Sequence, residues 1–346
     1  MTELHEYVGA VHLHSCYSDG SGTLREIAAA GGRAGLDYVV VTDHDTLRPR
    51  EDGWEGWRDG VLLVLGVEVT CQFRSHVVVF GARDVTALRF KPLARVLFDL
   101  RNQGARAFVA HAHPAKIMGF SMKGGELTDW EIEGFAGVEL WSFMHDICDK
   151  MAPWRVPSFL RNWPRRVRGP HPDTVAHWDR TTAERRFPAI GSLDNHGFVI
   201  PMLGGQILPY EAGFRTLRTH VFAAECTGRR EDAALMTEAL CRGRAFVALD
   251  MLAEARGFRF EADVPRGERL EMGEEHPWLG AATFEVRSPV AAKLALLCGG
   301  KPVAEAAGRE LRYAAQEAGV YRVEARLDGK PWVYTNPIYL RAVPEA

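Results

Sequence analysis

The stretch Asp37-Tyr38-Val39-Val40-Val41-Thr42-Asp43-His44-Asp45 is the part of the sequence that best indicates the fold. Its first half is an apolar, β-branched run without polar alternation, which is typical of a strand buried on both faces. Its second half places two carboxylates and a histidine where that strand opens into a loop. Charged groups at such a position cost free energy unless they are paired or bind something. The stretch predicts a buried strand with a functional end, and a helix-capping turn is the alternative.

Four other strand-like runs end in, or lead into, the same kinds of side chain. They are His12-Leu13-His14 with Asp19 in the following turn, Gly66-Val67-Glu68 with His76 opening the next strand, Ala110-His111-Ala112-His113-Pro114, and Asp194-Asn195-His196-Gly197. Each alone has a plain explanation, such as a turn residue, a core histidine or a Glu–Arg pair. Because the ends of parallel strands gather at one mouth of a barrel or sheet, the five together predict one shared site.

Strand-like and helix-like segments alternate from residue 8 to about 250, which predicts parallel strands in an α/β fold. A (β/α) barrel of about seven strands is the preferred interpretation, and an open doubly wound sheet is the alternative. The expected strands are 8–14, 37–42, 61–69, 77–81, 105–110, 137–141, 188–193 and 219–223, and the expected helices are 23–35, 92–103 and 231–242. Thr23 and Glu26 form a capping box at the start of the first helix.

Short strands separated by turn residues replace this pattern after about residue 251. The expected strands are 257–263, 283–288, 293–297, 310–314, 319–327, 331–335 and 337–341. Seven strands in roughly ninety residues suggest a β-sandwich. We therefore expect two domains, a barrel at 1–252 and a small all-β sandwich at 253–346.

The bulk composition narrows the class of protein. The chain has 346 residues, 47% of them apolar, and a formal net charge of -3, so whole-chain charge does not favour a nucleic-acid or membrane partner. No basic segment followed by an apolar stretch opens the sequence, and no apolar run is long enough to cross a bilayer. The six cysteines contain no Cys-x-x-Cys pair, which disfavours a disulfide framework. We expect a cytoplasmic protein, and the sequence does not indicate its oligomeric state.

The donor atoms of the five stretches predict a metal site. His12 and His14 stand at i and i+2, and alternate residues of a strand share one face. The donors are nitrogen and oxygen, with no thiolate, which suits Zn, Mn or Fe. In the doubled Ala-His-Ala-His-Pro we favour His113 as the ligand because Pro114 fixes the loop there, with His111 as a supporting or substrate-contacting group. That choice stays open on the sequence alone.

These motifs, in this order and in this strand context, resemble the PHP (polymerase and histidinol phosphatase) superfamily over residues 8 to about 250. The resemblance implies a distorted seven-stranded (β/α) barrel that holds two or three divalent metal ions, with Glu68 bridging two of them. It implies three ligand sets: His12, His14, Glu68 and Asp194; Glu68, His76 and His113; and Asp19, His44 and His196. The C-terminal part looks like the β-rich domain that follows the barrel in some bacterial members.

Clustered cations indicate hydrolysis of a phosphate ester. They lower the pKa of bound water and neutralise phosphoryl charge, so we expect a hydroxide that bridges the metals to be the nucleophile. The leaving group needs a proton, for which Asp45, His111 and His145 are the candidates. The leading hypothesis is a phosphomonoesterase acting on a small phosphorylated metabolite or nucleotide. A nuclease or phosphodiesterase acting on nucleic-acid ends is the alternative, and a metal-containing binding or regulatory module ranks last.

An arginine-rich segment lies between the strands that carry Glu139 and Asp194. Residues 151–172 contain no acidic side chain, and Trp154 and Trp163 are interleaved with the basic ones. Planar guanidinium groups suit phosphate recognition. We expect 151–187 to form a lid over the barrel mouth, and a solvated excursion is the alternative. The expected substrate-binding residues are Arg155, Arg161, Arg165, Arg166 and Arg168.

Overall fold

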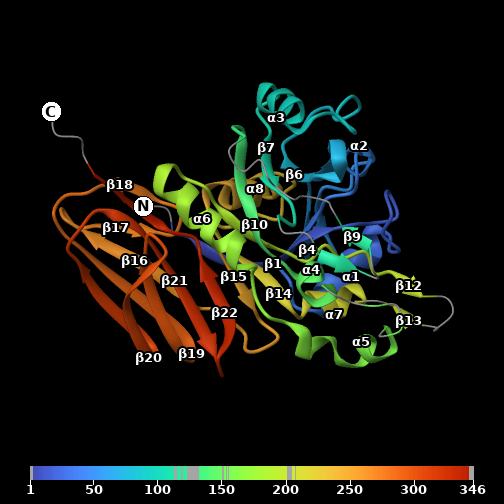
Figure 1. Cartoon of the computed structure of the whole chain (residues 1–346). Coiled ribbons are helices and arrows are strands. Elements are labelled where there is room, and N and C mark those ends of the chain that lie inside the picture. The colour runs from blue at the N-terminus through green and yellow to red at the C-terminus, as the bar shows by residue number, and fades with distance from the viewer. Residues whose placement is uncertain are drawn as a thin grey trace.

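The computed structural model describes residues 3–112, 115–117, 120–122, 132–149, 152, 154, 156–200, 205–206 and 208–342. Figure 1 shows a mixed α/β part built from roughly the first 250 residues beside a body of strands formed by the C-terminal residues. Among the described residues, no helix combines the length and apolar character needed to span a bilayer.

Three parallel strands form the start of the α/β part: β1 (His5–Leu13), β2 (Tyr38–Val41) and β4 (Val61–Leu65). Helix α1 (Leu24–Arg33) connects the first two and begins with the predicted capping box of Thr23 and Glu26. All of β2 is buried. Its alternate residues belong to two different apolar clusters, which confirms that both faces of this strand are covered.

A second sheet follows in the order β11-β10-β7-β6-β5. Its strands are β5 (Val67–Thr70), β6 (His76–Phe80), β7 (Arg106–Val109), β10 (Phe135–Ser142) and β11 (Ala189–Ser192). The last three are mutually parallel, whereas β6 is antiparallel to both neighbours, so the prediction of parallel strands is wrong there. The reason is the short connection 71–75, which can close a hairpin but cannot accommodate a crossover helix.

The two sheets meet through isolated parallel bridges between His44 and Glu68 and between Leu13 and Asn195. At the second junction the His14 amide donates to the carbonyl of Asn195, at 3.0 Å. Both junctions lie at strand ends that carry predicted ligands. The backbone itself therefore brings the separated motifs together.

The first sheet continues on its other side through β14 (Leu217–Ala223) and β15 (Ala245–Leu249) into the C-terminal strand β22 (Lys330–Thr335). The β1–β14 and β14–β15 pairs are antiparallel, another departure from the predicted parallel order. Between β14 and β15 in the chain lies α8 (Asp232–Arg242), which ends at Gly243 with φ +73° and matches the expected helix 231–242. One sheet thus runs through both parts of the chain.

The C-terminal part is all β within the described residues. Strand β19 (Ala282–Cys298) joins two of the predicted strands into one, with an irregular register between Arg287 and Ala292. Its first half pairs with β16 (Arg259–Val264) and its second half with β21 (Gly319–Leu327). The other strands are β17 (Glu268–Glu271), β18 (Glu275–Pro277), β20 (Lys301–Ala315) and β23 (Ile338–Arg341).

The segment predicted as a lid contains α5 (Val156–Asn162), η3 (Trp163–Arg166) and α6 (Pro172–Glu184). Helix α6 packs against β10 and β21, and its Trp178 is completely buried. Asp179 receives two guanidinium hydrogen bonds from Arg322 of the C-terminal part, at 2.6 and 2.9 Å. Residues 172–184 thus pack the two parts of the chain together, and a covering role for 151–171 stays a prediction.

The remaining elements are short. They are α2 (Arg48–Glu51), α3 (Leu93–Asn102), α4 (Phe143–Cys148), α7 (Tyr210–Phe214), η1 (Gln72–Arg74), β3 (Gly56–Arg58), β8 (Ala115–Ile117), β9 (Phe120–Met122), β12 (Val199–Ile200) and β13 (Gly205–Gln206).

Candidate metal centre

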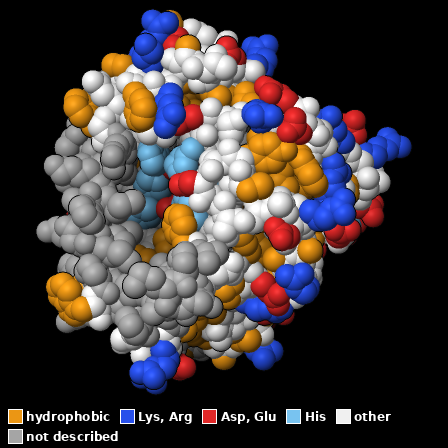
Figure 2. Space-filling model, turned by 90° about the vertical axis from the view of Figure 1, so that its right-hand side faces the viewer, with side chains coloured by type: hydrophobic (Ala, Val, Ile, Leu, Met, Phe, Trp, Pro, Cys, Tyr) orange, Lys and Arg blue, Asp and Glu red, His pale blue; other side chains and the backbone are white. Residues whose placement is uncertain are grey.

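Histidine side chains gather in a hollow of the face shown in Figure 2, with acidic groups beside them. The described residues contain four groups of His, Asp and Glu whose potential ligand atoms lie within 4.8 Å of one another. Two of the four groups contain residues from three of the predicted stretches, and each of the other two contains residues from two of them. The motifs that are separated in sequence therefore form one site.

The first group is His12, His14, Glu68 and Asp194, and all four residues are buried. The Nε2 atoms of His12 and His14 lie 3.1 Å apart, and Oε2 of Glu68 lies 3.0 and 3.1 Å from them. Oδ1 of Asp194 approaches His14 Nε2 at 3.4 Å. These four residues are the set that the PHP resemblance implies for one metal.

Glu68 faces two clusters with its two oxygens. Oε2 is turned toward the first group, and His44 Nδ1 lies 3.3 Å from it. Oε1 lies 2.9 Å from both His76 Nδ1 and His111 Nε2. A carboxylate with imidazoles on both of its oxygens has the arrangement expected of a bridge between two cations.

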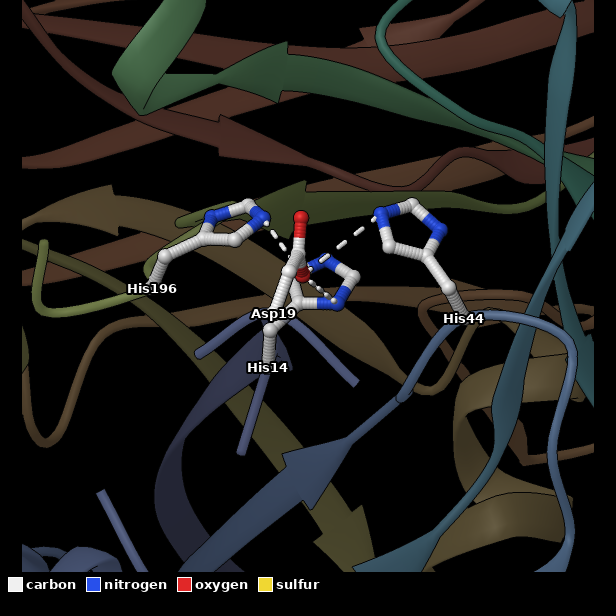
Figure 3. Close-up of side chains that lie close together, drawn as sticks. All are labelled: His14, Asp19, His44 and His196. Carbon is white, nitrogen blue, oxygen red and sulfur yellow. Dashed lines mark ion pairs between the residues drawn. The ribbon is translucent and has the colours of Figure 1, made fainter. Parts of the chain in front are cut away.

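The third group comprises His14, Asp19, His44 and His196, and Figure 3 shows the three rings around the Asp19 carboxylate. Oδ1 of Asp19 lies 3.3 Å from His196 Nε2, 3.8 Å from His14 Nδ1 and 3.9 Å from His44 Nε2. The Asp19 side chain is 53% exposed, whereas Glu68 and Asp194 are buried. This group therefore lies on the open side of the centre.

The carboxylates of the centre are held ionised. Burial alone would raise the pKa of Glu68, but the charges of His12 and His76 hold it well below its usual value. Burial also opposes ionisation of Asp19, yet the hydrogen bond and charge of His196 lower its pKa to about 2. Burial lowers the pKa of His44 to about 4, so this imidazole is neutral near pH 7 and can act as a ligand.

Two buried ring nitrogens at the centre would suit a bound cation. His14 Nδ1 and His44 Nδ1 are buried and make no hydrogen bond with any described residue. A buried polar atom without a partner costs roughly 1–3 kcal/mol, so natural structures rarely retain one without a reason. An imidazole nitrogen is a strong ligand for Zn, Mn or Fe. The donor set and its unpaired atoms both fit bound divalent metal ions.

Glu139 supports the ligands and was missed by the sequence reasoning. Its Oε1 lies 2.5 Å from His12 Nδ1, and its Oε2 accepts a 2.7 Å hydrogen bond from the His111 amide. The hydroxyl of Ser192 also lies 3.1 Å from His12 Nδ1. With Nδ1 so engaged, His12 presents Nε2 to the first group. The available signal was an acidic residue within the apolar run Gly137-Val138-Glu139-Leu140-Trp141.

Asp43 fixes the loop that carries Asp19. Its carboxylate accepts hydrogen bonds from the amide of Ser15 at 2.7 Å, from the Ser15 hydroxyl at 2.6 Å and from the Ser18 hydroxyl at 2.6 Å. Asp43 is not in any of the four candidate groups among the described residues. Its role is to order the turn between His14 and Asp19.

Unusual backbone geometry concentrates at the same place. His12, Asp45, His111 and Asp194 all have positive φ, at +66°, +52°, +26° and +50°. Such conformations cost of order 1–3 kcal/mol in residues other than glycine and cluster at functional sites. At His12 the pairing of β1 with β2 shifts between Val11 and Leu13, so a bulge, and not a regular strand, turns His12 and His14 toward each other.

The three predicted proton donors lie in different surroundings. The Asp45 carboxylate accepts from the Thr70 amide at 2.8 Å and pairs with Arg89 at 3.2 Å, and it belongs to none of the four groups. His145, in α4, stacks on His111 with ring centroids 4.4 Å apart and forms a fourth group with His111 and Asp194. His113, the favoured ligand in the doubled motif, lies outside the described residues, whereas His111 contacts Glu68 directly.

The predicted substrate-binding arginines also lie in different surroundings. Arg166 donates to the carbonyls of Ile147 and Asp149, both at 2.7 Å, and Arg168 pairs with Asp146 and Asp149. Arg161 and Arg165 are exposed. Arg155 lies outside the described residues. Two of the five arginines therefore hold the segment to α4.

Comparisons with known proteins yield only distant likenesses. No family model and no curated protein matches the chain. A two-domain protein containing a predicted PHP-like metal-dependent phosphoesterase, from Bacteroides vulgatus, is 17% identical, with a TM-score of 0.45, over 96% of this chain and 95% of its own. A putative metal-dependent phosphoesterase from Bifidobacterium adolescentis is 15% identical, with a TM-score of 0.36, over 56% of this chain and 89% of its own.

The lesion-specific endonuclease EndoQ from Pyrococcus furiosus is a third solved structure similar to this chain. It is 13% identical, with a TM-score of 0.42, over 77% of this chain and 64% of its own. Because all three likenesses are weak, we base the functional assignment on the geometry of the centre.

Proposed function

We propose that the chain is a PHP-type, metal-dependent phosphoesterase that hydrolyses a small phosphorylated metabolite or nucleotide. The observation that carries the proposal is Glu68, a completely buried carboxylate with imidazole nitrogens within 3.3 Å of both oxygens. Burying a carboxylate among several imidazoles costs desolvation free energy, and bound cations would offset that cost.

The proposed fold is a distorted seven-stranded barrel. Strands β4 and β5 lie end to end and count as one, which gives the ring β1, β2, β4/β5, β6, β7, β10 and β11. The support is the pair of bridges at His44–Glu68 and Leu13–Asn195, which link the two sheets on both sides. The reversed β6 is one source of the distortion.

The residues proposed to hold the ions follow from the groups above. One set is His12, His14, Glu68 and Asp194; a second is Glu68 and His76 with His111 or His113; and a third is Asp19, His44 and His196. We propose two or three ions of Zn, Mn or Fe. When bound, such ions lower the pKa of water and neutralise charge on phosphoryl oxygens.

The protein's own groups orient these ligands and serve the departing alcohol. Glu139 holds His12 with Nε2 facing the centre, and Asp43 orders the loop that presents Asp19. His145, His111 and Asp45 remain the candidate proton donors, and His145 Nδ1 lies 3.4 Å from Asp194 Oδ2. The exposed Arg161 and Arg165 are the proposed contacts for substrate phosphate.

The test is release of inorganic phosphate from a panel of sugar phosphates, nucleotides and short oligonucleotides, with Mn or Zn supplied. Asp194→Ala is expected to abolish release, and Asp173→Asn is a matched control because the Asp173 side chain is 75% exposed. Full activity in Asp194→Ala, with a metal content equal to that of the wild type, would overturn the proposal. Activity confined to the oligonucleotides would replace it with the nuclease alternative.

A further inference from the structure

A basic groove lies away from the metal centre. Its volume is about 880 Å³, and its walls include Arg101 at the end of α3, Arg106 at the start of β7, and Arg180 and Arg185 at the end of α6. We infer that this groove is a second binding site, for a small anion that carries at least two negative charges, such as a diphosphate.

The charge of the groove is unbalanced. Among the described lining residues, four arginines stand against two acidic residues, Glu133 and Glu184. No carboxylate among the described residues lies within the 4.0 Å ion-pair distance of any of these four guanidinium groups, whereas arginines elsewhere in the described residues form ion pairs at distances such as 2.6, 2.7 and 3.6 Å. The described lining residues therefore carry a net charge of about +2, which a dianion would match.

Local contacts fix part of the groove in place. Arg185 donates to the carbonyl of Phe135 at 2.8 Å, and its guanidinium lies 4.6 Å from the centroid of the Phe187 ring. Arg180 lies 2.7 Å from His177 Nδ1, so this guanidinium donates to the imidazole. Since a guanidinium has five N–H donors, each of these two retains donors for a ligand. Planar, partly fixed guanidinium groups suit phosphate oxygens.

The groove and the metal centre lie at opposite ends of the same strands. Arg106 begins β7, and His111 follows the end of that strand, about 16 Å further along at the usual rise per residue. Phe135 begins β10, and Glu139 in the same strand contacts His12. An anion in the groove would therefore not be the ester undergoing hydrolysis. The inference goes beyond the proposed function and does not depend on it.

Calorimetric titration of the metal-loaded full chain with inorganic pyrophosphate tests the inference. The double variant Arg106→Gln/Arg180→Gln removes two of the exposed guanidinium groups, and Arg309→Gln, an exposed arginine of the C-terminal strand β20, is the matched control. A Glu133→Gln variant changes the charge of the groove in the opposite direction. Thermal unfolding of each variant confirms that it is folded.

We expect one binding event that is weakened at least about tenfold in the double variant, unchanged in Arg309→Gln and strengthened in Glu133→Gln. Pyrophosphate held by the metal centre appears as a separate event that survives in the double variant and disappears in Asp194→Ala. Identical isotherms for the wild type and the double variant would overturn the second site while leaving the proposed phosphoesterase untouched. Weak binding that follows salt concentration but not the substitutions would overturn it as well.

Discussion

The carboxylate of Glu139 lies 2.5 Å from His12 Nδ1 and also accepts the amide hydrogen of His111, so one buried side chain links two of the candidate ligand groups. A carboxylate in this position fixes the imidazole tautomer that leaves Nε2 available and increases its basicity. The burial of the pair makes the contact rigid, since both side chains have no exposed surface.

We expect Glu139→Gln to weaken metal binding about 10- to 100-fold, because the neutral amide neither fixes this tautomer nor strengthens the donor. The measurement is competition for Zn against a chromogenic chelator. Glu133→Gln is the matched control, since Glu133 is exposed near the start of the same strand. Equal affinities for Glu139→Gln and wild type would show that Glu139 does not position His12.

Substitutions of Asp19 and of Glu68 are expected to reduce the number of bound metal ions by different amounts. Glu68 contacts imidazoles of every proposed set, whereas the ion-pair contacts of Asp19 within the described part of the chain are with His14, His44 and His196 alone. We expect Asp19→Asn to lose about one ion per chain and Glu68→Gln to lose at least two. Elemental analysis of both variants after the same metal loading makes the comparison. Equal stoichiometry in the two variants would contradict a bridging role for Glu68.

Much of the site could be predicted because its residues carry their own signal. An ionisable group at the end of an apolar run, such as Glu68 or Asp194, costs free energy unless it is paired or binds something, and several such groups at neighbouring strand ends indicate a shared site. The capping box of Thr23 and Glu26 predicted the start of α1 in the same local way. These features depend on neighbours in sequence, so one sequence suffices to find them.

What was missed depends on contacts between distant parts of the chain. Predicting the reversed direction of β6 would require knowing that residues 71–75 close a hairpin. The pairing of β15 with β22 joins segments that lie more than eighty residues apart in sequence. Arg168 looked available for substrate because Asp146 and Asp149, which pair with it, precede the basic segment. Arg166 looked available because nothing in the sequence shows that it donates to the main-chain carbonyls of Ile147 and Asp149. Composition alone does not show which charges are already paired.

Arg165 and Arg166 are neighbours with different expected roles. Arg166 donates to two main-chain carbonyls near the end of α4, so we expect Arg166→Gln to lower the free energy of unfolding by about 1–3 kcal/mol. Arg165 is exposed, so Arg165→Gln should leave stability within about 0.5 kcal/mol of wild type and raise KM for a phosphate ester. Denaturant unfolding and steady-state kinetics separate the two effects. An unchanged KM in Arg165→Gln would remove Arg165 from the substrate site.

A buried charge cluster at the junction of the two parts predicts how stability depends on pH. His220 is completely buried between Glu6, at 2.8 Å, and Asp250, at 3.3 Å, and Arg259 of β16 pairs with Glu6 at 2.6 Å. Burial alone would lower the pKa of His220, but hydrogen bonds to Asp250 and Glu6 raise it above its usual value. Burial would raise the pKa of Glu6, yet the hydrogen bonds from His220 and Arg259 lower it.

The directions of these two pKa shifts define a pH range in which both groups stabilise the folded protein. The contribution of His220 is fully present below its unfolded pKa, about 6.5, and is lost as pH rises through the folded value. The contribution of Glu6 is present above its unfolded pKa, about 4.3, and is lost as pH falls through the folded value. Both contributions are therefore complete between about pH 4.5 and 6.5.

We expect His220→Gln to destabilise the protein by about 1–3 kcal/mol near pH 6, because it removes the buried cation between the two carboxylates. Glu6 then keeps only Arg259, and Asp250 only Arg218, as ion-pair partners among the described residues. The loss should shrink as pH rises through the folded pKa of His220, since the wild type then loses the same charge. Thermal unfolding across that range gives the comparison, with His5→Gln as control because His5 is exposed in the same strand as Glu6. A destabilisation that does not change with pH would mean that His220 supports the junction through packing on Phe246, with ring centroids 4.4 Å apart, and not through charge.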